Sequence, residues 1–99
     1  MEKKYIDVYQ KCIDVWGWDA QIKMCIEEMS ELTKELCKFY RAGEMSSSEE
    51  LKNHIREEIA DTLNMAEQMQ FLFGAEEVDK IRDYKIERTR KILDEEQKN

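Results

Sequence analysis

Residues 20–40 read AQIKMCIEEMSELTKELCKFY, and this stretch decides the fold. It contains no glycine or proline, and apolar side chains return every three or four residues along it, which predicts one long amphipathic helix. Directly after it, residues 41–48 (RAGEMSSS) form the clearest break in the chain. The apolar stripe of this helix is predicted to comprise Ile22, Cys25, Ile26, Met29, Leu32, Leu36 and Tyr40.

A first helix is expected before this stretch, over about residues 2–16. Its apolar side chains lie around most of the circumference, so we expect it to be covered on more than one side. Gly17 stops this helix, and Asp19 is a good N-cap for the helix that follows.

A third helix is expected after the break, over residues 49–73. Gly43 suits the C-cap of the preceding helix, and Ser47 with Glu50 has the pattern of a capping box at the start of the new one. Gly74 ends the third helix.

The fourth helix is predicted over residues 76–94, followed by a polar tail, residues 95–99, that frays. No linker and no low-complexity segment interrupts the chain, and 99 residues make one small domain with a thin core. The sequence therefore predicts a single all-α domain of four helices, residues 1–99, whose helical bundle is completed by oligomerisation.

Composition and charge argue against several classes of function. There is no run of about 18 apolar residues and no signal-peptide core, so we expect neither a membrane span nor secretion. A net charge of −7 argues against nucleic-acid binding, and it repels a free triphosphate unless a divalent cation lies between. The three cysteines form no CxxC pair, which favours reduced thiols in a cytoplasmic protein.

Two short segments repeat one pattern of acids. Residues 27–32 (EEMSEL) and 57–62 (EEIADT) each carry two adjacent acids and a third acid three residues later. In an antiparallel hairpin, residues equally far from the two ends of the break face each other. Counting back from residues 41 and 48 places Glu28 opposite Asp61, and Glu31 opposite Glu58.

Four carboxylates in this arrangement repel one another, by about 1 kcal/mol per pair at 4 Å in water and about 4 kcal/mol at a partly buried site. A hard divalent cation relieves this repulsion, and all-oxygen ligands suit Mg²⁺ or Mn²⁺. The competing interpretation is two solvated acidic faces, although Met24, Met65 and His54 lie on the same faces. A di-iron carboxylate bundle is excluded, because it needs Glu-x-x-His on two helices and His54 is the only histidine.

The acids also carry a family resemblance. Glu27-Glu28-x-x-Glu31, followed after 26 residues by Glu58-x-x-Asp61, resembles the EExxE…ExxD signature of the MazG-like all-α nucleoside triphosphate pyrophosphatases. The likeness covers about residues 15–92. It includes the upstream pattern Trp16-Gly17-x-x-x-Gln21 and the C-terminal pattern Lys85-x-x-Arg88.

The resemblance implies Mg²⁺-dependent hydrolysis of (d)NTPs between the α and β phosphates, giving a monophosphate and pyrophosphate, in nucleotide-pool housecleaning. It implies homodimers or homotetramers whose bundles pair across subunits. Glu27 or Glu31 would orient or deprotonate the attacking water, although Glu27 also suits a solvated surface acid. The implied ligands of Mg²⁺, which Mn²⁺ can replace, are Glu28, Glu31, Glu58 and Asp61.

The remaining substrate contacts are predicted from residue type and position. Lys85 and Arg88 share a stripe with apolar residues of the fourth helix, so they face inward and suit phosphate binding, unless they reach the rim and only cover the core. Trp16 and Trp18 suit stacking on a base, and Trp16 equally suits the core. The residues predicted to hydrogen-bond the base are Gln21 and Asn64, of which Asn64 also suits plain helix surface.

Two other functions stay open at this point. Dimeric dUTPases share the carboxylate scheme, but they are usually longer than this chain. A non-catalytic helical interaction module would dimerise through the helix over residues 2–16 and would keep its acids exposed to solvent.

Overall fold

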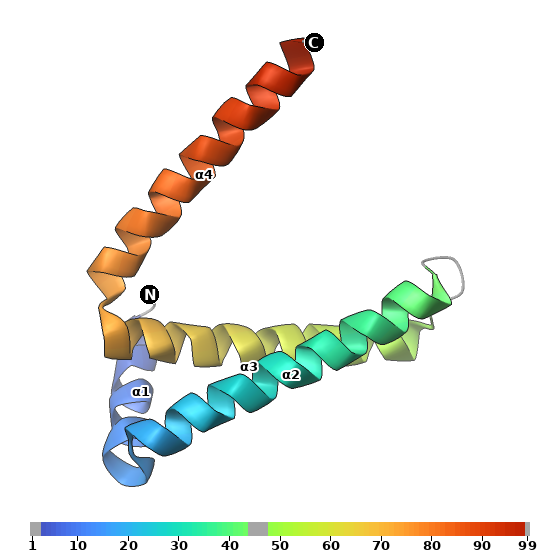
Figure 1. Cartoon of the computed structure of the whole chain (residues 1–99). Coiled ribbons are helices and arrows are strands. Elements are labelled where there is room, and N and C mark those ends of the chain that lie inside the picture. Colours follow the sequence, from blue (N-terminus) through green and yellow to red (C-terminus); the bar gives the residue numbers. More distant parts are fainter. Residues whose placement is uncertain (1–2, 44–47, 99) are drawn as a thin grey trace. The chain divides into compact units, whose positions relative to one another are not determined.

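The computed structural model describes residues 3–43 and 48–98. Every regular element in these ranges is an α-helix, as Figure 1 shows, which confirms the all-α prediction. Among the described residues, no helix is long and apolar enough to cross a membrane. The four helices are α1 (Lys3–Trp16), α2 (Trp18–Ala42), α3 (Glu49–Phe73) and α4 (Ala75–Lys98).

The chain divides into two compact units, Met1–Met69 and Gln70–Asn99. The first unit contains α1, α2 and most of α3, and the boundary falls inside α3. The second unit contains the last turn of α3 and all of α4. A single domain over residues 1–99 stays a prediction.

Glycines end the first three helices at the predicted places. Gly17 and Gly43 have φ values of 87° and 81°, a conformation that costs little only for glycine, and Gly74 follows α3 directly. The prediction that Asp19 caps α2 is wrong, because α2 begins at Trp18 and Gly17 makes no side-chain cap. Asp19 instead lies in the first turn, where a carboxylate interacts favourably with the helix dipole.

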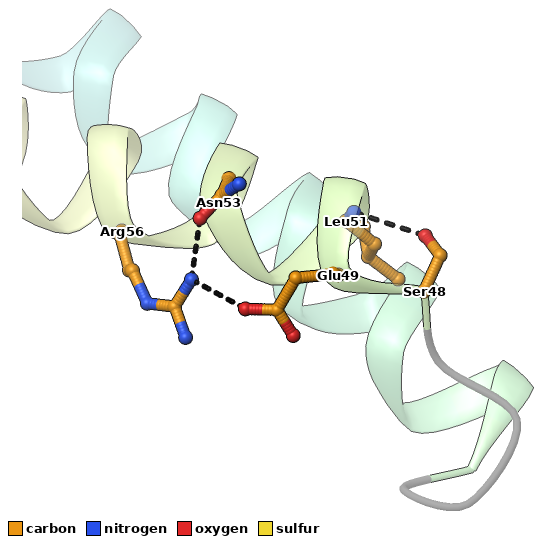
Figure 2. Close-up of polar contacts among 5 residues, drawn as sticks. All are labelled: Ser48, Glu49, Leu51, Asn53 and Arg56. Atoms are coloured by element: carbon orange, nitrogen blue, oxygen red, sulfur yellow. Dashed lines mark hydrogen bonds and ion pairs between the residues drawn. The ribbon is translucent and has the colours of Figure 1, made fainter.

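A serine hydroxyl caps α3, as Figure 2 shows. The Leu51 backbone N–H donates to Oγ of Ser48 at 3.0 Å, which satisfies one of the unpaired amides of the first turn. Two turns later, Arg56 donates to Glu49, at 3.1 Å, and to the side-chain oxygen of Asn53. The predicted capping residue, Ser47, lies outside the described residues.

Helix α4 continues to Lys98, four residues beyond the predicted end at residue 94, and the fraying of the polar tail stays a prediction. Glu, Gln and Lys in this stretch are good helix formers, and Lys98 in the last turn complements the helix dipole. No side chain of α4 is buried.

Helices α2 and α3 form an antiparallel hairpin (Figure 1). Their buried and half-buried residues recur in alternating steps of four and three. This is the spacing of a side-by-side helix pair. On α2 the inner positions are Gln21, Cys25, Glu28, Leu32, Glu35 and Phe39. On α3 they are Leu51, Ile55, Glu58, Thr62, Met65 and Met69, together with the buried Gln68.

The predicted apolar stripe of α2 is therefore only partly correct. Ile26 is 60% exposed, although it was expected to pack inward, and Leu63 on α3 is 62% exposed. The inner face of each helix is displaced by one residue from its apolar stripe, so a band of apolar side chains stays uncovered beside the hairpin contact. On the first unit this band comprises Ile26, Met29, Leu36, Tyr40, Ile59 and Leu63.

The core of the first unit is half polar. Tyr9 of α1, Cys25 of α2 and Met65 of α3 are its buried apolar residues. The buried polar residues are Gln21, Glu35 and Gln68. Because a buried polar group without a hydrogen-bond partner lowers stability, the stability of this core depends on the partner that each of these groups finds.

Candidate metal centre

A buried glutamine pair sets the register of the hairpin. Nε2 of Gln68 donates to Oε1 of Gln21 at 2.6 Å, and both residues are almost fully buried. These two residues are equally far from residues 41 and 48, so the hairpin is symmetrical about the break. The hydroxyl of Thr62 donates to the backbone oxygen of Glu28 at 3.3 Å, which agrees with this register.

Three carboxylates converge in this register. Glu28 of α2 and Glu58 and Asp61 of α3 each offer one oxygen, and these oxygens all lie within 4.8 Å of one another. Glu28 and Glu58 are half-buried and Asp61 is exposed. The cluster therefore has two acids on the inner face and one at its edge, open to solvent.

Electrostatics disfavours full ionisation of this cluster. Burial raises the pKa of Glu28, and the nearby charges of Asp61 and Glu58 raise it further. Burial also raises the pKa of Glu58, and Asp61 and Glu31 add to the effect. Among the ion pairs of residues 3–43 and 48–98, none involves Glu28, Glu58 or Asp61.

The cluster fits a hard divalent cation. Its donors are all carboxylate oxygens, the ligands that Mg²⁺ and Mn²⁺ prefer. Oε2 of Glu58 is buried and has no hydrogen-bond partner in the described part of the chain. A buried carboxylate oxygen without a partner is costly, and a cation is one of the few groups that satisfies it.

The two other acids of the predicted signature lie beside this cluster. Glu31 is exposed and is not among the three converging residues, but its charge raises the pKa of both Glu28 and Glu58. Glu27 is also exposed and contributes the smallest of the effects on the pKa of Glu28. The structure thus brings together three of the four predicted ligands, with Glu31 next to them.

One acid of the inner face was missed in the sequence. Glu35 is 8% exposed, and its charge is among the causes that raise the pKa of Glu58. It follows Glu28 by seven residues, which is two turns along the same face of a paired helix. That spacing was the available signal, but the four-acid pattern does not contain this position.

A cavity of about 290 Å³ opens beside the carboxylates, between α1 and α3. Asn64 and Met65, which follow Asp61 by one helical turn, belong to its wall. Gln68 is also in the wall, and its amide is held by Gln21. The α1 side of the cavity is formed by Tyr5, Val8, Tyr9 and Cys12.

The other predicted base contacts are placed differently. Gln21 is buried against Gln68 and is not in the cavity wall. Trp16 and Trp18 are 62% and 51% exposed and are not in the wall either, so the interpretation of Trp16 as a core residue is wrong. A tight glycine turn separates α1 from α2, and it leaves both indoles at the surface.

The predicted phosphate-binding residues lie on α4, in the second unit. Lys85 and Arg88 are both exposed, so the inward position expected from the apolar stripe is not found. Ile81 and Tyr84 of the same stripe are 54% and 68% exposed.

Compared with protein-family models, with curated proteins and with solved structures, the chain matches none.

Proposed function

We propose that this chain is a Mg²⁺-dependent nucleoside triphosphate pyrophosphohydrolase that cleaves between the α and β phosphates and releases a monophosphate and pyrophosphate. The convergence of the carboxylates of Glu28, Glu58 and Asp61 within 4.8 Å, with no basic partner among the described residues, carries the proposal. Such a cluster, on a protein of net charge −7, needs a cation before a triphosphate can approach it.

The converging acids and the exposed acids beside them are assigned different roles, metal binding and activation of water. Glu28, Glu58 and Asp61 would hold the cation, and Glu31, exposed beside them, would be a further ligand. When bound, Mg²⁺ or Mn²⁺ neutralises charge on the triphosphate and activates water. Glu31 or Glu27, both exposed beside the cluster, orients or deprotonates that water.

The cavity between α1 and α3 is the best candidate for the base. It begins one turn from Asp61, and the side-chain amides of Asn64 and Gln68 line it. The rings of Tyr5 and Tyr9 have centroids 6.3 Å apart and are tilted by 53°, which leaves aromatic surface on the α1 side. Lys85 and Arg88 remain candidates for binding the outer phosphates.

Self-association follows from the uncovered apolar band. Ile26, Met29, Ile59 and Leu63 are 60%, 52%, 41% and 62% exposed, and they run along both helices of the hairpin. A second copy would cover this band and complete a helical bundle, which suits a homodimer or homotetramer. The thiols of Cys12, Cys25 and Cys37 are all free, which fits a cytoplasmic housecleaning enzyme.

A substrate panel tests the reaction class. The full chain is incubated with all common NTPs and dNTPs and with dUTP, with and without Mg²⁺, and monophosphate is resolved from diphosphate. We expect monophosphate and pyrophosphate that depend on Mg²⁺ and are lost in Glu58→Gln but retained in Glu57→Gln, an exposed neighbour on α3. Diphosphate with orthophosphate would place the cleavage at the wrong bond.

The same panel separates the alternatives. Turnover of dUTP alone would identify a dUTPase-type enzyme. If no triphosphate is hydrolysed and Glu58→Gln changes nothing except stability, the chain is a helical interaction module.

A further inference from the structure

The side-chain amide of Gln68 is a buried polar group in the wall of the cavity between α1 and α3. Gln68 is 3% exposed. Tyr9 is also buried in this wall, but its hydroxyl already donates to Glu67 at 3.1 Å. Asn64 and Tyr5 are exposed, so water competes for their hydrogen bonds. A ligand in the cavity therefore meets Gln68 as its buried hydrogen-bonding group.

The hydrogen bond to Gln21 decides which end of the Gln68 amide is left for a ligand. A side-chain amide has two N–H donors on its nitrogen and one acceptor oxygen. Nε2 of Gln68 donates to Oε1 of Gln21 at 2.6 Å. Gln21 is 2% exposed and is not in the cavity wall, so it holds the nitrogen of Gln68 towards the interior. The oxygen of Gln68 is the end that remains available.

The remaining oxygen of Gln68 has no donor and is not enclosed. Among the described residues, the bond to Gln21 is the one hydrogen bond that the Gln68 side chain makes. The buried side-chain oxygens without a partner in these ranges belong to Glu35 and Glu58, so Oε1 of Gln68 keeps contact with accessible space. Because Gln68 is otherwise almost fully buried and lines the cavity, that space is the cavity.

An acceptor oxygen in this position discriminates between bases that differ in one group. Cytosine and adenine carry an exocyclic amino group, which is a donor. Uracil and hypoxanthine carry an acceptor oxygen at the corresponding position. The oxygen of Gln68 accepts a hydrogen bond from the amino group, whereas two facing oxygens repel each other and each loses a hydrogen bond to water.

We propose that Gln68, oriented by Gln21, selects triphosphates whose base carries an exocyclic amino group, cytosine or adenine. This inference rests on the proposed function, since it assigns the base of that substrate. The cavity volume of about 290 Å³ is at the lower end of the range for small-molecule sites, roughly 300–1,000 Å³, which suits a single base. Gln68 contacts the base, and Gln21 is a positioning residue.

Matched pairs of substrates test this selection. The kcat/KM of the full chain is measured with Mg²⁺ for dCTP against dUTP and for dATP against dITP, because the members of each pair differ in this one group. We expect kcat/KM to be at least about tenfold higher for the amino member of one pair or of both. The pair that discriminates identifies the base that fits. Equal values in both pairs, or a preference for dUTP or dITP, would overturn the proposal.

Gln21→Leu tests the positioning role. It leaves the residues of the cavity wall unchanged but frees the amide of Gln68 to turn, so the ratio of the two kcat/KM values should fall to within about twofold of one. A general loss of stability would lower both rates together and leave their ratio unchanged. Gln10→Leu, at an exposed position of α1 outside the wall, is the control and keeps the ratio. A full ratio in Gln21→Leu would overturn the role of Gln21.

The double variant Gln21→Leu with Gln68→Leu removes both amides, so neither is left buried without a partner. It should fold, as circular dichroism can check, and should also lose the discrimination. If the double variant keeps the ratio of the unmodified chain, Gln68 does not read the base and the proposal is overturned.

Nucleoside binding separates this inference from the proposed reaction. Cytidine, uridine, adenosine and inosine are added to the full chain without metal, and the side-chain amide signals of Gln68 are followed by nuclear magnetic resonance. If the amino nucleosides bind more tightly but no triphosphate is hydrolysed, the base site stands and the reaction fails. If triphosphates are hydrolysed without a base preference, the reaction stands and this inference fails. Equal or absent binding at Gln68 would also overturn it.

Discussion

Two layers of the α2–α3 contact contain polar side chains, and they differ in whether these side chains have hydrogen-bond partners. In the glutamine layer, formed by Gln21 and Gln68, the two amides satisfy each other at 2.6 Å. In the carboxylate layer, formed by Glu28, Glu58 and Asp61, the side chains converge, burial and the neighbouring charges raise the pKa of Glu28 and of Glu58, and Oε2 of Glu58 has no partner in the described part of the chain. The first layer agrees with the hairpin register, and in that register the second layer brings the three carboxylates of the proposed metal site together.

The largest expected effect comes from breaking the carboxylate layer at its solvent edge. Asp61→Asn keeps the size of the side chain but removes one charged ligand, so we expect pyrophosphate release to fall at least about 100-fold. The measurement is the Mg²⁺-dependent rate with whichever triphosphate the panel identifies. Glu57→Gln, on the same turn region of α3 but exposed, is the control and keeps its rate. An active Asp61→Asn would mean that the cluster does not hold the catalytic cation.

Breaking the glutamine layer is expected to lower the stability of the fold. Gln68→Leu leaves the amide of Gln21 buried without a partner, and we expect the free energy of unfolding to fall by about 1–3 kcal/mol in urea titrations. The double variant with Gln21→Leu as well should recover most of that loss, because neither polar group remains. A double variant as unstable as the sum of the single ones would show that the pair has no special role in the hairpin.

Substituting the carboxylate layer should stabilise the chain at neutral pH, whereas substituting one residue of the glutamine layer destabilises it. The pKa of Glu58 is raised in the folded chain above its ordinary value of 4.5, so the stability that Glu58 contributes is present below pH 4.5 and is lost as the pH rises through the raised pKa. Without divalent cations, Glu58→Gln should therefore match the unmodified chain in urea midpoint near pH 4 and exceed it at pH 7.

Adding Mg²⁺ at pH 7 should reverse that order. The unmodified chain gains stability by mass action, by about 2.7 kcal/mol at a hundredfold excess over the dissociation constant, and Glu58→Gln gains little. If Mg²⁺ stabilises both proteins equally, the ion binds somewhere other than Glu58.

The sequence predicts the ends of the helices and the pairing across the hairpin, but it does not predict how each helix is rotated about its axis. The helix ends at Gly17, Gly43 and Gly74, and the pairing of Glu28 with Asp61, follow from local signals and from counting along a symmetrical hairpin. The rotation of each helix does not, because two adjacent stripes, one apolar and one mixed, both have helical spacing.

The mixed stripe became the inner face, which exposed Ile26 and buried Glu35. Sequence patterns rank apolar side chains first as candidates for burial, so a contact made by glutamines and acids is missed. The apolar band that this rotation leaves uncovered is the surface that the proposed oligomer would bury.

The smallest expected effect lies where α1 joins the glutamine layer. The hydroxyl of Tyr9 donates to Oε2 of Glu67 at 3.1 Å, and burial, together with that hydrogen bond, raises the pKa of Tyr9 to about 12. Tyr9→Phe removes this hydrogen bond, at a cost of about 0.5–1.5 kcal/mol in urea titrations at pH 7. Because Glu67 is only half-buried, water can replace the donor, and we expect the lower end of that range.

The pH dependence of Tyr9 gives this prediction a second measurement. The folded pKa lies above the unfolded value of 10.0, so the stability from the neutral phenol is complete below pH 10 and is lost between pH 10 and about 12. The unmodified chain should lose its advantage over Tyr9→Phe within that window. A difference in the free energy of unfolding between Tyr9→Phe and the unmodified chain that stays constant from pH 8 to 12 would contradict this prediction. It would show that the hydrogen bond from Tyr9 to Glu67 does not contribute to stability, unlike the one between the two glutamines.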